Sequence, residues 1–328
     1  MNIKAGIIGT GSYVPEGSYD NFYFEKIMDT SDEWIRTRTG ISERRIASEK
    51  QATSDLAYEA AKRALADAEI SAEDVELIIL ATASPDKPIP STACIVQDKL
   101  GASNAAAFDI SAACSGFIYA LDIARRFVEN GTHKNVLIIG AETLSRIVDY
   151  TDRTTAVLFG DGAGAAVISQ TEENGIMSAH IGADGSGGDY LQIPAGGSRL
   201  PASDDTVANN MHKVKMAGSD VFKFAVRKMA DASKEAIKKA GLELEDIDFL
   251  VPHQANIRII EASAKRLKID MDKVYVNLDR YGNMSAASVP VALDEAVKEG
   301  KIKKGDKVVL VGFGGGLTWA SSVLEWTK

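Results

Sequence analysis

Cysteine is scarce in this chain, and its N-terminal residues carry no export signal. Only Cys94 and Cys114 occur among 328 residues, so at most one disulfide could form and a disulfide-stapled fold is excluded. The first residues, MNIKAGIIGTGSYVP, contain no long apolar segment followed by a cleavage site. We therefore expect a cytoplasmic protein whose two cysteines are free thiols.

Long apolar runs and a surplus of basic residues are also missing. The longest apolar runs, Val136–Ala141 and Leu77–Ala81, are far shorter than the roughly 18 residues of a membrane span. Lys and Arg number 37 against 46 Asp and Glu, and the net charge of −9 argues against a nucleic-acid partner. The four histidines are isolated and the cysteines lack the spacing of metal ligands, so we expect no metal site. We expect a globular protein that binds neither membranes nor nucleic acids.

The chain repeats itself once, at an offset of 172 residues. Residues 72–79 (AEDVELII) resemble residues 244–251 (LEDIDFLV), and residues 135–140 (NVLIIG) resemble residues 307–312 (KVVLVG). Two helix-like stretches match at the same offset. Such a repeat predicts two similar halves, which we assign to residues 1–173 and 174–328.

Within each half, helical and extended patterns alternate. The segments that read as helices or buried strands include Asp55–Glu69, Ser91–Leu100, Cys114–Asn130 and Ile257–Leu267 (helices), and Leu77–Ala81, Val136–Gly140 and Asp248–Pro252 (strands). This alternation favours α/β halves, each with a largely parallel sheet, packed with helices between the two sheets. Residues 184–219 lack periodicity and are predicted to form an elaborated loop, and the first half carries an insertion near residues 141–158.

Cys114 is the first candidate for chemistry. It lies in SAACSG (residues 111–116), directly before a helical segment, and a helix N-terminus favours the thiolate form. Small neighbours would let a substrate approach closely. A buried structural cysteine is the competing interpretation, because cysteine is among the most buried residue types. The residues alone support the two interpretations about equally, whereas Cys94 is interpreted as a packing residue.

His253 and Asn283 are the other candidates. His253 follows a predicted strand in VPHQAN, at the carboxyl end where α/β sheets bind ligands. A lone histidine is more often structural, but the repeat places His253 opposite Ala81 and Cys114 opposite Ala286. Asn283 comes just before that second helix start. If the halves face each other, the cysteine, histidine and asparagine converge in one crevice.

The glycine-rich runs offer an alternative function. Residues 160–165 (GDGAGA) match a dinucleotide-binding fingerprint formally, but an apparent strand rather than a helix follows them. In the run at residues 9–14, Val14 stands where the third glycine belongs. A nucleotide-binding module is therefore the weaker alternative. Residues 312–316 (GFGGG) are better interpreted as backbone that closely approaches another group.

Five segments carry a resemblance to a known family. They are TSDEWIRTRTG (30–40), AACSG (112–116), PHQAN (252–256), GNMSAAS (282–288) and GFGGGLTW (312–319). In this order, spread over nearly the whole chain, they resemble β-ketoacyl-acyl-carrier-protein synthase III. The resemblance implies a thiolase-like five-layer αβαβα fold built from two related halves, in a homodimer. It implies decarboxylative condensation of an acyl-CoA primer with malonyl-acyl carrier protein, through an acyl-cysteine, at the start of fatty acid synthesis.

The same resemblance assigns roles to residues. Cys114 matches the nucleophile, His253 and Asn283 match the pair that binds the malonyl thioester carbonyl, and the backbone N–H groups of Cys114 and Gly315 match the oxyanion hole. The matches for coenzyme A and pantetheine contacts are Thr30, Trp34, Arg38, Arg153, Gly218, Phe222, Ala255 and Asn256, with Trp34 and Arg153 on either side of the adenine. The matches for carrier-protein docking are Lys223, Arg258, Lys265 and Arg266. No cofactor is expected, because coenzyme A enters as part of a substrate.

One departure concerns the primer. Ile89 stands where several family members have a phenylalanine that reaches the partner's acyl pocket. Acetyl-CoA is the default primer, and a branched or longer acyl-CoA is the alternative. A sister enzyme of the same fold that makes a ketone or quinolone-like product is the rival function in the same class.

Overall fold

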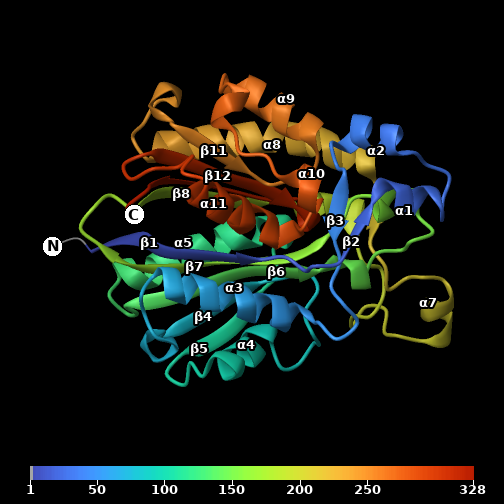
Figure 1. Cartoon of the computed structure of the whole chain (residues 1–328), viewed down its shortest axis with the longest axis horizontal. Coiled ribbons are helices and arrows are strands. Elements are labelled where there is room, and N and C mark those ends of the chain that lie inside the picture. The colour runs from blue at the N-terminus through green and yellow to red at the C-terminus, as the bar shows by residue number, and fades with distance from the viewer. Residues whose placement is uncertain (1–2) are drawn as a thin grey trace.

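The computed structural model describes residues 3–328, which form two β-sheets and three layers of helices. Figure 1 shows these layers stacked one above the other, with helices outside each sheet and between the two sheets. The five-layer α/β arrangement expected from the sequence is therefore confirmed. In the part of the chain that the structure describes, no helix is both long enough and apolar enough to cross a membrane.

The two sheets have the same strand order. Across the first sheet the strands are β1 (Lys4–Tyr13), β7 (Asp161–Thr171), β6 (Asn135–Thr143), β4 (Leu77–Ala81) and β5 (Ala106–Ile110). Across the second they are β8 (Ile176–Ala183), β13 (Thr318–Glu325), β12 (Lys307–Gly314) and β11 (Phe249–Pro252). A parallel bridge from Val274 to Leu250 in β11 takes the position of β5 in this order. The strands of the first sheet end at Thr171 and those of the second begin at Ile176, on either side of the boundary assigned from the repeat.

Both sheets are mixed, so the expectation of largely parallel sheets is wrong. Only β4 with β5, β4 with β6, and β11 with β12 pair in parallel; β1, β7, β8 and β13 pair antiparallel with their neighbours. The connections explain this. Only Gly315–Leu317 join β12 to β13, and a parallel pair needs a crossover of a dozen or more residues.

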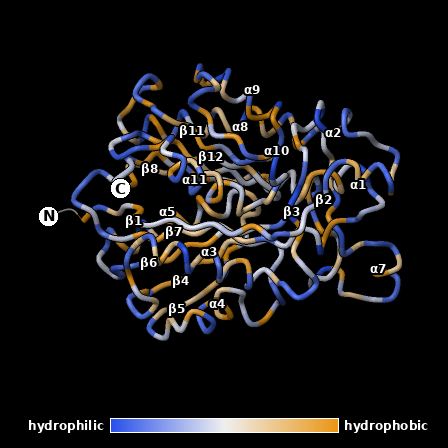
Figure 2. Tube along the Cα trace, in the orientation of Figure 1, coloured by the Kyte–Doolittle hydropathy of each residue, from blue (hydrophilic) through white to orange (hydrophobic). Residues whose placement is uncertain are grey.

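Each helix layer buries a different face. Helices α3 (Thr53–Asp67) and α4 (Thr92–Leu100) cover the outside of the first sheet, and α8 (Gly218–Lys239) and α9 (Ile257–Leu267) the outside of the second. Helices α5 (Gly116–Glu129) and α11 (Ser288–Lys298) lie between the sheets. β4 is buried on both faces: Leu77 and Ile79 join the central core, while Ile78 and Leu80 join the outer one. Figure 2 shows hydrophobic residues along these inner strands and hydrophilic residues in many outer loops.

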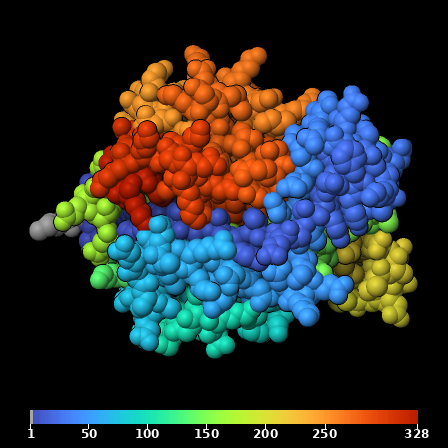
Figure 3. Space-filling view, in the orientation of Figure 1, coloured from blue at the N-terminus to red at the C-terminus, as the bar shows by residue number. Residues whose placement is uncertain are grey.

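Short elements border the layers. The remaining helices and strands are β2 (Ser18–Asp20), α1 (Asn21–Glu25), α2 (Asp32–Thr39), β3 (Glu43–Arg45), α6 (Arg153–Ala156), β9 (Leu191–Gln192), α7 (Asp204–Ala208), β10 (Lys215–Met216) and α10 (Leu278–Tyr281). The single 3₁₀ turns are η1 (Ala72–Asp74), η2 (Ala113–Ser115), η3 (Leu144–Arg146), η4 (Gly185–Tyr190), η5 (Leu244–Asp246), η6 (Met271–Lys273), η7 (Ser285–Ala287) and η8 (Gly315–Leu317). Figure 3 shows the segment around α2 lying against the second half, where Asn256 donates a hydrogen bond to the Arg38 carbonyl at 2.9 Å.

Most predicted elements near the site are confirmed, with shifts at their ends. β4 and α9 have the predicted bounds, and α4 begins one residue later than predicted because Ser91 caps its N-terminus. The helix predicted to start at Cys114 begins at Gly116, since Cys114 lies in the preceding turn η2. Cys94 lies on the exposed face of α4, so its interpretation as a packing residue is wrong.

Candidate active site

A sharp turn presents Cys114. It lies in η2 between β5 and α5, where Ala113 has a left-handed φ of 45°. A non-glycine residue in this region is strained and persists only when its surroundings hold it. In the second half, η7 begins with Ser285 at φ 46°, which is 172 residues from Ala113. The repeat thus extends to a pair of equally strained turns, one at Cys114 and one just after Asn283.

His253 follows β11 and is 1% exposed. Its backbone N–H donates to the Val311 carbonyl at 2.7 Å, and its ring meets the edge of Phe313 with 5.5 Å between ring centroids. Neither ring nitrogen has a hydrogen-bond partner within the described chain. Burial lowers the pKa of His253 to about 3, so its ring is neutral near pH 7. A neutral ring with free nitrogens can donate one hydrogen bond to a substrate.

Asn283 is oriented by its own turn. Its backbone N–H donates to the Leu158 carbonyl at 2.9 Å, and its side-chain Oδ1 accepts a hydrogen bond from the Ser285 N–H at 2.8 Å. Because Oδ1 is occupied, the side chain offers its NH₂ group to the site.

The three candidates meet in one cavity. Cys114, His253 and Asn283 all line a narrow cavity of about 100 Å³ between the two halves. The convergence predicted from the repeat is therefore observed.

Two glycines let β12 approach the nucleophile. A Cβ atom at Gly314 would lie 2.5 Å from the Cys114 amide nitrogen, closer than any side chain can be accommodated. Gly315 follows directly and lines a cavity with Cys114. The backbone of both predicted oxyanion-hole residues thus borders the site.

Burial reverses the expectation for the thiol. Cys114 is only 6% exposed, and this desolvation raises the pKa of its thiol to about 12. The helix N-terminus was expected to favour the thiolate. The structure shows that this effect is too weak to offset burial, so the resting sulfur is a thiol.

The site lies midway along a tunnel. The narrow cavity shares walls on one side with an outer cavity of about 410 Å³ and on the other with an inner cavity of about 420 Å³. The predicted coenzyme A residues that line the outer or narrow cavity are Trp34, Arg38, Arg153, Gly218, Phe222, Ala255 and Asn256. Thr30 and Ile89 line none of the three, and Ile89 is 86% exposed on its own chain.

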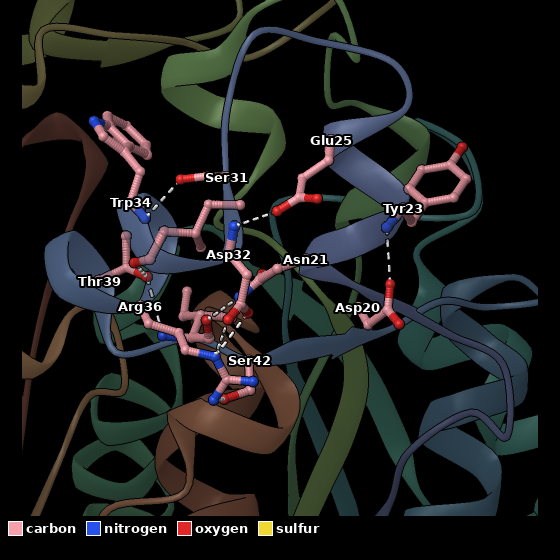
Figure 4. Close-up of polar contacts among 12 residues, drawn as sticks. Asp20, Asn21, Tyr23, Glu25, Ser31, Asp32, Trp34, Arg36, Thr39 and Ser42 are labelled. Atoms are coloured by element: carbon pink, nitrogen blue, oxygen red, sulfur yellow. Dashed lines mark hydrogen bonds and ion pairs between the residues drawn. The ribbon is translucent and has the colours of Figure 1, made fainter.

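The mouth of the tunnel is built on α2. Figure 4 shows Trp34 on this helix, with its backbone N–H capped by Ser31 at 3.1 Å. Asp32 fixes the helix by accepting hydrogen bonds from Asn21 and Arg36. The Arg153 guanidinium lies 4.9 Å from the Trp34 ring centre. The two side chains are stacked on each other, so an adenine could enter between them only if Arg153 swings away.

The predicted docking residues are exposed on α8 and α9. Arg258 lines the outer cavity and lies over the Phe222 ring at 5.9 Å. Lys223, Lys265 and Arg266 line none of the three cavities of the tunnel and lie on the surface beside its mouth or further along α9.

The glycine run at residues 160–165 does not have a nucleotide-binding geometry. It enters β7, an inner strand paired antiparallel with β1 and β6, and no helix follows it. A phosphate-binding run needs a helix N-terminus after the strand. The nucleotide-binding alternative is therefore wrong.

Several residues at the site were not found from the sequence. The apolar wall of the inner cavity includes Leu144, Ile147, Leu191 and Val214, from the insertion and the long loop. These segments lack periodicity, so no pattern marked their side chains as facing one cavity.

Comparisons with known proteins decide the family. Two family models match, the 3-oxoacyl-[acyl-carrier-protein] synthase III model over residues 108–185 and the C-terminal model of the same enzyme over residues 237–326. The β-ketoacyl-[acyl-carrier-protein] synthase III of Clostridioides difficile is 70% identical over 327 residues, covering 100% of both chains. The chain belongs to the β-ketoacyl-[acyl-carrier-protein] synthase III family.

Solved structures agree. A 3-oxoacyl-[acyl-carrier-protein] synthase III from Aquifex aeolicus superposes with a TM-score of 0.91 at 50% identity, covering 99% of this chain and 100% of that one. The Thermus thermophilus enzyme gives 0.91 at 49% identity, over 98% and 99% of the two chains. The thiolase-like fold and the identification as a condensing acyltransferase are confirmed. Its activity is the family's condensation of acyl-CoA with malonyl-acyl carrier protein, which initiates fatty acid synthesis.

The raised thiol pKa predicts how Cys114 reacts with iodoacetamide. Below its pKa a thiol forms about tenfold more thiolate per pH unit, and only the thiolate is alkylated. In a Cys94→Ser variant, the alkylation rate should therefore keep rising between pH 7 and 10 without a plateau. Mass spectrometry of the labelled peptide measures the rate, and Cys114→Ala reports the exposed Cys94 alone. A plateau below pH 9 would contradict the thiol assignment.

Proposed function

We propose that the condensation proceeds in two half-reactions through an acyl group on Cys114. One observation carries this proposal: Cys114, His253 and Asn283 line a buried cavity between an outer mouth with basic side chains and an apolar inner cavity. The mouth suits a phosphate-bearing carrier, and the inner cavity suits an acyl chain. A thioester carbonyl presented between them would reach the sulfur.

In the first half-reaction, the Cys114 sulfur attacks the acyl-CoA carbonyl. A new sulfur–carbon bond forms, the bond to the coenzyme A sulfur breaks, and the thiol proton ends on that departing sulfur. The negative oxygen that develops points at the N–H groups of Cys114 and Gly315, which stabilise it. Exchange of one thioester for another changes little energy, so no cofactor is needed.

In the second half-reaction, malonyl-acyl carrier protein loses CO₂ and leaves an enolate. The neutral His253 ring and the Asn283 NH₂ group donate hydrogen bonds to the enolate oxygen as its charge develops. The enolate carbon attacks the acyl-Cys114 carbonyl, the carbon–sulfur bond breaks, and the sulfur regains a proton. The buried site limits competing hydrolysis and protonation.

The primer and its partner subunit belong to the same proposal. Acetyl-CoA is the default primer, and the inner cavity of about 420 Å³ leaves room for branched or longer acyl groups. A homodimer, in which Ile89 reaches the other subunit's cavity, fits the exposure of Ile89 and the free edge of β5. We place the enzyme in the cytoplasm, with acyl-CoA and malonyl-acyl carrier protein as its partners.

The acyl group should be found on Cys114. Incubation with acetyl-CoA is expected to add one acetyl group per chain, mapped to this residue by peptide mass spectrometry. Cys94→Ala should be acetylated normally, because Cys94 lies outside the tunnel on exposed α4. Acetyl on Cys94, or undiminished labelling of Cys114→Ala, would refute the acyl-Cys114 intermediate.

The two half-reactions should separate by residue. His253→Ala and Asn283→Ala are expected to retain substantial acetyl transfer, since the oxyanion hole is backbone. Each should lose decarboxylation by on the order of 10²–10³, because one donor to the enolate is removed. Release of labelled CO₂ and acetyl exchange are measured separately. Normal decarboxylation by both variants would show that the assigned roles are wrong.

Arg258 should assist the carrier protein. Acyl carrier proteins are acidic, and this chain is acidic too, so a productive encounter needs local basic charge. Arg258→Glu is expected to lower kcat/KM for malonyl-acyl carrier protein and to weaken its salt dependence. Lys62→Glu, the same change of charge on the distant helix α3, is the matched control. Equal losses with acetyl-CoA and carrier protein would mean that Arg258 has no docking role.

A further inference from the structure

A buried carboxylate, Glu142, lies behind the catalytic turns. It is at the end of β6 and 0% exposed. Among the described residues no lysine, arginine or histidine forms an ion pair with it. Its oxygens instead accept hydrogen bonds from the Ala83 N–H at 3.1 Å, the Thr82 hydroxyl at 3.2 Å, the Ser84 hydroxyl at 2.5 Å and the Ala286 N–H at 3.4 Å.

The donors around Glu142 are themselves held in place. The Ser84 N–H donates to the Thr82 hydroxyl oxygen at 3.0 Å, and the Thr143 N–H donates to the Ser84 hydroxyl oxygen at 2.9 Å. Both hydroxyl protons are therefore free to point at Glu142. Removing the carboxylate would leave several buried donors without a partner, at a cost of about 1–3 kcal/mol for each.

The repeat explains where this carboxylate sits. At the offset of 172 residues, Glu142 corresponds to Gly314, and Ala286 corresponds to Cys114. In the second half, Gly314 has no side chain and leaves space beside the Cys114 amide, where the thioester oxygen is proposed to bind. In the first half, the Glu142 side chain fills the equivalent space and accepts the Ala286 N–H. One of two related pockets is thus open to substrate and the other is filled by Glu142.

Glu142 is coupled to Asn283 through η7. Ala286 belongs to this turn, and so does Ser285, whose N–H fixes the Asn283 oxygen at 2.8 Å. The Ser285 side chain also hydrogen-bonds to Glu142. β6 lies tightly against the same turn, since a Cβ at Gly140 would come within 2.2 Å of the Ala286 carbonyl oxygen. The left-handed φ of Ser285 needs such support to persist.

We infer that Glu142 is a positioning residue: its carboxylate holds η7 against β6 and thereby orients the Asn283 NH₂ group toward the malonyl thioester. This inference rests on the proposed role of Asn283. It does not place Glu142 in contact with either substrate.

The test compares the two half-reactions in Glu142→Ala and Glu142→Gln. Misplacement of a catalytic group by about 1 Å costs roughly 100-fold, so Glu142→Ala should lower kcat for CO₂ release by about 10- to 100-fold. Acetylation of Cys114 should stay within about threefold, because η2 does not depend on the carboxylate. Glu142→Gln keeps one oxygen acceptor for Ala286 and should lose less. If Glu142→Ala does not fold, the same ratio is measured for Glu142→Gln.

Two controls separate positioning from loss of structure. Asp294→Asn removes another fully buried carboxylate, which accepts hydrogen bonds from Thr10 and Ser12 away from the tunnel. Per folded molecule, it should leave the ratio of the half-reactions unchanged. Equal loss of both half-reactions in the Glu142 variants would overturn the inference. Asn283→Ala is assayed in parallel: normal CO₂ release there refutes the proposed role of Asn283, whereas its loss there with normal release in Glu142→Ala refutes only the role of Glu142.

Discussion

Everything at the reaction centre depends on the close approach of two strand ends to two sharp turns. β12 reaches the Cys114 turn, and β6 reaches the Ser285 turn, at distances that only glycine permits. Each turn contains a residue with left-handed φ, at 45° and 46°. The packing of the two sheets around α5 and α11 supplies the energy that holds these strained turns in place. The nucleophile and the amide that faces it are therefore fixed by the core of the protein rather than by a loop.

Burial then sets the charge state of the site. The same enclosure that shields an acyl-enzyme from water raises the pKa of Cys114 and lowers that of His253. The resting pair is neutral, unlike the thiolate–imidazolium pair of many cysteine enzymes. A neutral His253 suits hydrogen-bond donation to a developing enolate, and a neutral Cys114 is protected from unproductive reaction until a thioester fills the tunnel.

Duplication produced two similar frameworks, and a few side chains made them different. Cys114 faces Ala286 across the repeat, His253 faces Ala81, and Gly314 faces Glu142. Each replacement removes a reactive or open group from one half. The result is a single reaction centre, with the remnant of the second filled by a carboxylate and its hydrogen-bond donors.

The sequence by itself determined the duplicated α/β fold, the family and the three residues that meet in the narrow cavity. It could do so because the repeat and the buried strands are local patterns, and because short motifs at strand ends and helix starts keep their place in the fold. It failed where the outcome depends on groups distant in the chain. The direction of the Cys114 pKa shift follows from how completely both halves exclude water. The antiparallel strands follow from connections too short to cross over. The inner cavity is built from aperiodic segments, and the contacts of Glu142 join residues 82–84 to Ala286. Such properties arise only when the two halves pack, since burial and hydrogen-bond partners are decided by tertiary contacts that no local pattern records.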